Sequence, residues 1–138
     1  METALSRRAD PADAALLAAR LCLGAAFLYS GATKALDFSG AVAEFAALGL
    51  PLTAAAVLAT VAVQLAGGLG VVLGLHTRAA ALLLAAFTVA ATLIGHRFWL
   101  LSGAEFGRQF TTALEHLAIV GGFALLAARG PGRYALDR

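Results

Sequence analysis

A few polar side chains interrupt an otherwise apolar sequence, and their types and positions allow chemistry. Lys34 is the only lysine in a chain that has nine arginines. A lysine ammonium group can lose its proton when it is desolvated, whereas a guanidinium group stays charged. Lys34 is therefore a candidate for binding a ligand. The alternative is a lysine that extends to the lipid headgroups from the end of a helix.

Further candidates lie within apolar segments or at their ends. Gln64 falls near the middle of one segment, where its amide needs a partner from another helix or forms a simple helix–helix contact. Trp99, close to Arg97, also fits an interfacial aromatic belt. We predict a ligand site made from seven residues: Lys34, Gln64, His96, Arg97, Trp99, Glu115 and His116.

Three chemistries could use these residues. Imidazole and carboxylate groups suit zinc or iron, so His96, His116 and Glu115 form a candidate metal set, although no fourth ligand is evident. The two histidines could also hold a haem. We favour the third chemistry, a quinone or small polar ligand held by Lys34, His96 and Glu115 in an apolar slot. Such a network can also be purely structural, and the sequence assigns no catalytic residue.

Two stripes of residues recur at steps of three and four, which place each stripe on one face of a helix. The first comprises Arg20, Gly24, Phe27, Gly31 and Lys34. The second comprises Thr60, Gln64, Gly67, Val71 and Gly74. Glycines let neighbouring helices approach closely. We therefore expect both stripes to face the interior of a bundle, and we assign Arg20 and Arg78 structural roles.

The composition explains why these exceptions stand out. Hydrophobic residues make up 61% of the 138-residue chain and charged residues 13%, against about 45–50% and about 25% in soluble domains. This balance excludes an ordinary soluble enzyme, a disordered segment and a nucleic-acid-binding domain. The single cysteine, Cys22, excludes an intrachain disulfide.

Four apolar segments are each long enough to cross a bilayer as a helix, which takes about 20 residues. They predict an all-α, four-helix transmembrane bundle in a single domain (14–128), with spans at about 14–33, 52–75, 79–98 and 110–128 and tails at 1–13 and 129–138. A short amphipathic interfacial helix is expected between the first two spans, and a loop at 99–109. Arg20 interrupts the first span, which argues against a cleaved signal peptide.

The distribution of basic residues predicts that both termini lie in the cytoplasm. With four spans, the side that holds the termini has six basic residues: Arg7, Arg8, Arg78, Arg129, Arg133 and Arg138. The other side has Lys34, Arg97 and Arg108. Cytoplasmic loops carry an excess of basic residues in membrane proteins.

Six short motifs follow one another along the chain. They are Arg20-x3-Gly24-x2-Phe27-x2-Ser30-Gly31-x2-Lys34, Gly49-Leu50-Pro51, Gly67-Gly68, Gly74-Leu75-x-Thr77-Arg78, His96-Arg97-Phe98-Trp99 and Gly130-Pro131-Gly132-Arg133-Tyr134-x-Leu136-Asp137. In this order, they resemble the DoxX family. The likeness extends from about Arg20 to Asp137. The sequence departs from the family pattern at Gln64, where members often have glutamate, and at Glu115-His116, where we expect a basic or amide pair.

The resemblance implies a small four-helix bacterial inner-membrane protein associated with respiratory or oxidative-stress oxidoreductase complexes. We therefore expect a quinone-interacting or accessory subunit that acts with a soluble or membrane-bound oxidoreductase partner, because the chain has no cofactor motif of its own. Quinone is the ligand class that we favour, and the sequence disfavours haem and metal. The alternative is a non-enzymatic assembly or anchoring subunit, or a small solute carrier, which would form a homo-oligomer.

Overall fold

The fold is entirely helical over residues 10–137, which are the residues that the computed structural model describes. The elements in chain order are α1 (Pro11–Leu36), α2 (Phe38–Ala47), α3 (Thr53–Leu73), α4 (Thr77–Gly95), the 3-10 helix η1 (Phe98–Leu100) and α5 (Gly103–Arg129). Helices α1, α3, α4 and α5 are long and apolar enough to cross a membrane. The predicted four-helix bundle with a short helix between the first two spans is confirmed.

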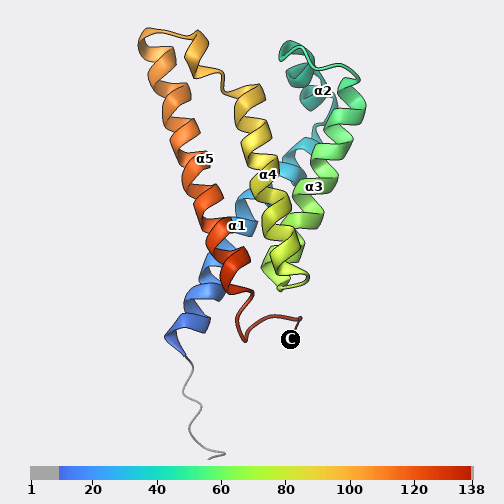
Figure 1. The fold of residues 1–138 in the computed structure, drawn as a ribbon. Helices are drawn as coiled ribbons and strands as arrows, with labels where there is room; N and C mark the ends of the chain where they lie inside the picture. The colour runs from blue at the N-terminus through green and yellow to red at the C-terminus, as the bar shows by residue number, and fades with distance from the viewer. Residues whose placement is uncertain (1–9, 138) are drawn as a thin grey trace, which may run out of the picture.

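The long helices form two pairs that diverge toward one end of the molecule. Helix α1 packs against α3, α4 packs against α5, and α2 rests on α3. The helices lie close together at the end that holds Pro11 and Arg129, here called the termini end, and spread apart at the opposite end, here called the α2 end (Figure 1). The backbones of the two pairs are therefore farther apart at the α2 end than at the termini end (Figure 1).

Turn residues define the helix ends that produce this arrangement. Asp10 caps α1 by accepting a hydrogen bond from the Ala12 N–H at 2.9 Å. Between α3 and α4 the chain reverses over a few residues, with Gly74 (φ 73°) ending α3 in the left-handed conformation that favours glycine. The tight turn places α4 against α3.

Glycines on both predicted stripes allow the helices to approach closely. A Cβ atom added at Gly24 of α1 would lie 3.1 Å from the backbone oxygen of Gly68 on α3, and would also press on Val72. A Cβ added at Gly67 would lie 2.8 Å from a Leu84 methyl carbon on α4. Both stripes therefore face the interior, as predicted.

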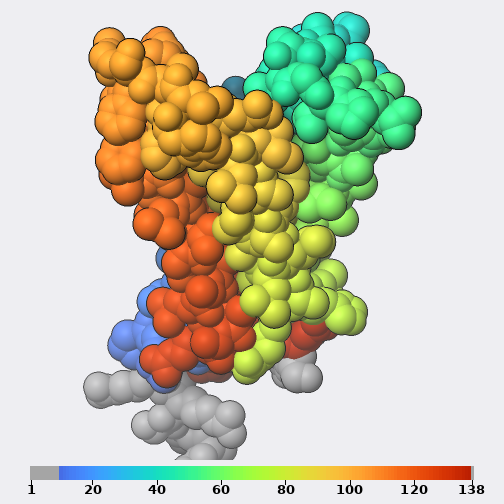
Figure 2. Space-filling model, turned by 45° about the horizontal axis from the view of Figure 1, so that its top comes forward, coloured from blue at the N-terminus to red at the C-terminus, as the bar shows by residue number. Residues whose placement is uncertain are grey.

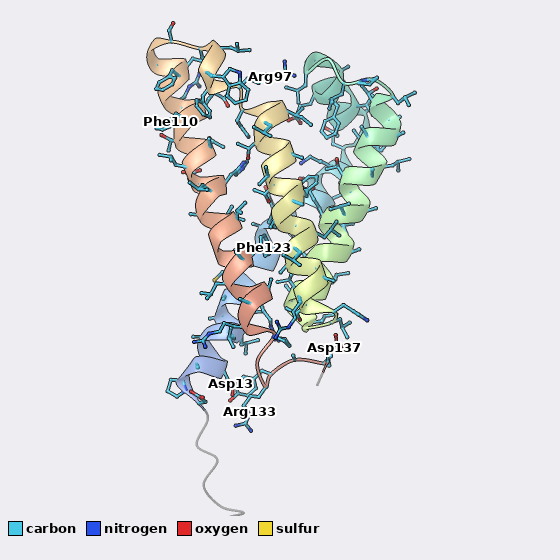
Figure 3. All side chains as sticks on the ribbon, viewed as in Figure 1. Asp13, Arg97, Phe110, Phe123, Arg133 and Asp137 are labelled. Carbon is cyan, nitrogen blue, oxygen red and sulfur yellow. The ribbon has the colours of Figure 1, made fainter. Side chains whose placement is uncertain are left out.

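The core lies in the half of the bundle nearer the termini end. Phe123 of α5, fully buried, points between the helices (Figure 3), and its ring centroid lies 5.4 Å from that of Phe27 on α1. Phe27 also meets Phe87 of α4 edge to face, at 6.3 Å. Edge-to-face contacts of this kind add to the stabilisation from burial. This aromatic cluster joins α1, α4 and α5 where the two helix pairs come together.

The last residues, which we expected to form a tail, fold back across the termini end as an ordered segment (131–137). The guanidinium of Arg20, buried inside the bundle, donates to the backbone oxygens of Pro131, at 3.0 Å, and Tyr134. The backbone N–H of Leu136 donates to Leu73 O at 3.1 Å. The segment therefore ties α1 to the end of α3 through hydrogen bonds to backbone atoms.

The other predicted structural arginine, Arg78, lies beside the end of α5. Its guanidinium donates to the backbone oxygens of Ala127 and Ala128, at 2.9 and 3.1 Å. Carbonyl groups in the last turn of a helix have no partner within that helix, and a cation there also interacts well with the helix dipole. Arg78 thus connects the start of α4 to the end of α5.

The loop predicted at 99–109 is wrong for its second half. Helix α5 begins at Gly103, seven residues before the predicted span, and η1 occupies part of the remainder. The first turns of α5 are polar but helical, with Arg108 paired to Glu105 and with stacked Phe106 and Phe110 rings. Hydropathy identifies only the part of a helix that lies in the bilayer, so it missed these turns.

Candidate functional site

A cavity of about 510 Å³ lies between the two helix pairs. Figure 2 shows the surface hollowed at the α2 end, between the yellow and orange atoms of α4 and α5 and the teal and green atoms of α2 and α3. Its walls are mostly apolar, with polar atoms from five elements, and the residues used below are Ser30, Lys34, Glu44, Gln64, Thr88, His96 and His116. The deepest are Gln64 and Thr88, which are buried.

A small polar cluster joins α1 and α3 inside the cavity. The Ser30 hydroxyl oxygen accepts from Lys34 Nζ at 2.8 Å and from Gln64 Nε2 at 3.1 Å. Gln64 is only 5% exposed, and its Oε1 has no hydrogen-bond partner among residues 10–137. A buried acceptor left unpaired costs about 1–3 kcal/mol. The cluster therefore leaves an acceptor unpaired at the closed end of the cavity.

Two histidines lie together on the opposite wall. The ring centroids of His96, just after α4, and His116, on α5, are 5.0 Å apart in an edge-to-face arrangement. His116 Nδ1 lies 2.7 Å from Thr92 Oγ1, and His96 Nδ1 lies 2.6 Å from Gln109 Oε1. Each ring is thus held by a side chain of the α4–α5 pair, and its Nε2 atom has no hydrogen-bond partner in the described part of the chain.

The apolar surface between these polar groups suits a flat or branched organic group. Phe27 and Phe87 lie near the closed end, while Phe45 and Leu48 of α2 contribute nearer the mouth. Glu44, an exposed residue of α2, is also part of the lining. Binding pockets for small organic ligands combine such apolar walls with a few placed polar groups. The cavity can therefore enclose an amphipathic ligand with a polar head.

Four of the seven predicted site residues line this cavity, namely Lys34, Gln64, His96 and His116. The other three do not. Arg97 is exposed at the α2 end, where its side chain donates to Ile94 O at 3.1 Å (Figure 3). Trp99 is half exposed and packs on Phe98.

Glu115 is exposed on the outer face of α5, away from the cavity. Adjacent residues on an α-helix point about 100° apart, and here His116 lines the cavity while Glu115 does not. The candidate metal set of His96, His116 and Glu115 is not assembled. Within residues 10–137, no three histidine, cysteine or acidic side chains come together in a metal-binding arrangement.

Several hydroxyl and amide groups of the site were not predicted from the sequence. Thr88, Thr92 and His96 recur at steps of four and so share one face of α4, a pattern that could have identified them. Ser30 lies one residue before Gly31 of the first stripe, and only its contacts with Lys34 and Gln64 identify it. Gln109 was missed because it was assigned to a loop.

Known proteins share both the family pattern and the overall length of this chain. The DoxX family model matches residues 15–97. Inner membrane protein YphA of Escherichia coli (strain K12) is 34% identical over 123 residues, which is 89% of this chain and 88% of the relative. Inner membrane protein YqjF of the same organism is 31% identical over 126 residues, 91% and 92% of the two chains. No solved structure matches the chain significantly. Since the family model covers more than half of the sequence, the chain belongs to the DoxX family.

Proposed function

We propose that this protein binds the head group of a quinone-type ligand in the cavity between its helix pairs, as an accessory subunit of a membrane-associated oxidoreductase complex. One observation supports this function above the others. The cavity has mostly apolar walls that include three phenylalanines, and it ends at a buried polar cluster in which Gln64 Oε1 is unpaired within the described residues. A quinone has a flat ring with polar atoms at its edge and an apolar tail, which matches this combination.

The electrons for such a ligand come from a partner. The sequence carries no cofactor motif, and hard redox chemistry in proteins depends on a cofactor or a bound redox-active molecule. A subunit of this kind holds and orients the quinone while a soluble or membrane-bound oxidoreductase exchanges electrons with it. The His96–His116 pair, near the mouth, is the part of the cavity that such a partner would approach.

We also propose that the termini end faces the cytoplasm and that the cavity opens toward the opposite side of an inner membrane. Arg78, Arg129 and Arg133 lie at the termini end, and Lys34, Arg97 and Arg108 lie toward the α2 end. Arg7, Arg8 and Arg138, which add to the cytoplasmic count, lie outside the described residues. The excess of basic residues supports this orientation.

The function is tested by extracting the purified full-length protein with organic solvent and measuring the quinone that it retains. We expect quinone to co-purify with the wild-type protein and to fall several-fold in Lys34→Ala and His96→Ala. Arg97→Ala is the matched control, because Arg97 neighbours His96 but lies outside the cavity, and it should retain quinone. Recovery of lipid alone from every variant, including wild type, would refute the proposal.

The outer face of α5 favours a second candidate function, a non-enzymatic assembly or anchoring subunit. Glu115 is exposed within this span, and Gly121 has open space where a side chain would lie. Small residues and polar groups at such positions promote contact between transmembrane helices. A self-associated oligomer that contains no quinone would support this candidate over the first.

A further inference from the structure

We propose that the cavity selects a ligand that donates hydrogen bonds, so that it binds the dihydroxy, quinol form of the ring in preference to the quinone. This inference rests on the proposed function and names the form of the ligand. The preference for a donor arises because several polar atoms of the cavity have no proton left to donate. A quinone carbonyl can only accept a hydrogen bond, whereas a quinol hydroxyl can both donate and accept.

Thr88, on the α4 wall, presents only an acceptor. Its hydroxyl donates its one proton to the backbone oxygen of Leu84 at 2.7 Å. The side chain is 3% exposed and lines the cavity. With the proton used inside its own helix, the Thr88 Oγ1 atom has lone pairs left but no hydrogen to offer a ligand.

The contacts of His116 assign its ring proton to the Nδ1 atom. Thr92 donates its hydroxyl proton to Thr88 O at 2.7 Å, since a carbonyl oxygen can only accept. With the Thr92 proton placed on Thr88 O, the 2.7 Å contact between Thr92 Oγ1 and His116 Nδ1 assigns the ring proton to Nδ1. In the neutral ring this leaves Nε2 as an acceptor.

The contact of His96 with Gln109 assigns the proton of its ring as well. Its Nδ1 atom lies 2.6 Å from Gln109 Oε1, which cannot donate. The amide nitrogen of Gln109 lies 3.3 Å from a Glu105 carboxylate oxygen, and this contact fixes which way the amide points. His96 thus also carries its proton on Nδ1 and, when neutral, has Nε2 as an acceptor.

Gln64 completes the wall of acceptors. Its amide nitrogen donates to Ser30 Oγ, and the Oε1 atom, in a side chain that is 95% buried, has no donor near it in residues 10–137. Gln64 Oε1, Thr88 Oγ1 and the two histidine Nε2 atoms come from α3, α4, the residue after α4, and α5. They require hydrogen-bond donors, which a carbonyl-only head group lacks.

Donors lie across the cavity on α1, and the hydroxyl of Thr60 on α3, which is also in the lining, is a further donor. The Lys34 ammonium group has three N–H bonds and uses one of them on Ser30. The Ser30 hydroxyl oxygen accepts from both Lys34 and Gln64, so its remaining capacity is its own proton. A ligand hydroxyl can accept from this α1 side and donate to the acceptor wall. A quinone carbonyl can accept from the α1 side, but it has no proton to donate to the acceptor wall.

The test compares two probes that differ only in the oxidation state of the head group, decylubiquinol and decylubiquinone. The full-length protein in lipid nanodiscs is titrated with each probe by calorimetry, without oxygen and with a metal chelator present. We expect at least tenfold tighter binding of the quinol, equivalent to about 1.4 kcal/mol. The ratio of the two affinities is measured within one protein, so it is insensitive to partial loss of folded material.

Two substitutions test the origin of the preference. Thr88→Val removes one acceptor and should lower the affinity ratio severalfold, while Thr111→Val should leave it unchanged. Thr111 is the matched control because its hydroxyl also donates to the carbonyl four residues earlier, at 2.9 Å, but it faces outward from the cavity. Gln64→Leu should bring the ratio close to one.

The possible results separate the quinol preference, its origin in the acceptor wall, and the proposed function. Equal affinity for the two probes, or tighter binding of the quinone, overturns the inference but leaves a quinone-type ligand at the cavity. A quinol preference that survives both Thr88→Val and Gln64→Leu overturns its assignment to the acceptor wall. If folded wild-type protein binds neither probe, the proposed function fails and this inference fails with it.

Discussion

Arg20 is a buried cation whose partners are backbone carbonyl groups. No acidic side chain of residues 10–137 lies within ion-pair distance of it, and its guanidinium instead binds the carbonyl oxygens of Pro131 and Tyr134. An uncompensated buried charge is strongly destabilising, so these two contacts are what make the position tolerable. Arg20 thus holds the C-terminal segment against the bundle, at the opposite end of the molecule from the cavity.

Replacing Arg20 should destabilise the protein in a way that depends on the C-terminal segment. We expect Arg20→Leu to lower the free energy of unfolding by about 2–4 kcal/mol, because both carbonyl groups lose their donor. Removing residues 131–138 should cost a similar amount, and the two changes together should cost less than their sum by about 1–2 kcal/mol. Reversible unfolding in detergent measures this double-mutant cycle. Strictly additive effects would contradict the contact.

At the scale of the helices, the crossing of α1 and α3 depends on the absence of side chains. Gly24 and Gly68 allow the two backbones to approach closely, because a Cβ added at Gly24 would lie 3.1 Å from Gly68 O and one added at Gly68 would lie 3.4 Å from Gly24 O. In a bilayer, where apolar surface alone does not drive helices together, close packing of this kind supplies much of the association. The two stripes are therefore the surfaces that decide which helices pair.

Enlarging Gly24 should separate these helices. We expect Gly24→Val to destabilise the folded protein by about 1–3 kcal/mol, since the new methyl groups press on Val72 and on the Gly68 backbone. Gly121→Val is the control, because Gly121 has open space around it, and it should change stability by less than about 0.5 kcal/mol. Thermal unfolding of both variants in the same detergent compares them. Equal losses of stability would argue against close packing at Gly24.

Features that depend on residues close together in the sequence were predictable, and features that depend on contacts between distant residues were not. Long apolar runs predicted four helices, and steps of three and four residues predicted their interior faces. The start of α5 at Gly103 was missed because its first turns are polar. The fold-back of residues 131–137 was missed because it depends on hydrogen bonds between side chains and backbone atoms more than a hundred residues apart.

The site was predictable where a residue type is costly in a membrane. Polar groups within membrane-spanning helices are energetically costly and often functional. For this reason the sequence pointed to Lys34, Gln64, His96 and His116. Glu115 stood out for the same reason, but the rotation of α5 points it away from the cavity. Ser30 and Thr88 gave no comparable signal, because small hydroxyl residues are common in such helices and bond to their own backbone.

At the scale of the whole molecule, the arginine distribution predicts a fixed orientation. We expect a fluorescent-protein fusion after residue 138 to fluoresce in bacterial cells and an alkaline phosphatase fusion at the same point to be inactive, since the termini would lie in the cytoplasm. A phosphatase fusion in the 101–103 connection serves as the opposite control and should be active. The reverse pattern would place the mouth of the cavity on the cytoplasmic side.

The divergence of the two helix pairs also gives the molecule unequal widths at its two ends (Figure 1). A body of this shape displaces more lipid area in one leaflet than in the other. Lipids beside the wide end are crowded and those beside the narrow end are spread, which the bilayer relieves by bending away from the narrow side. The geometry that makes room for a ligand therefore also makes the protein a wedge, which favours membrane that curves outward at the α2 end.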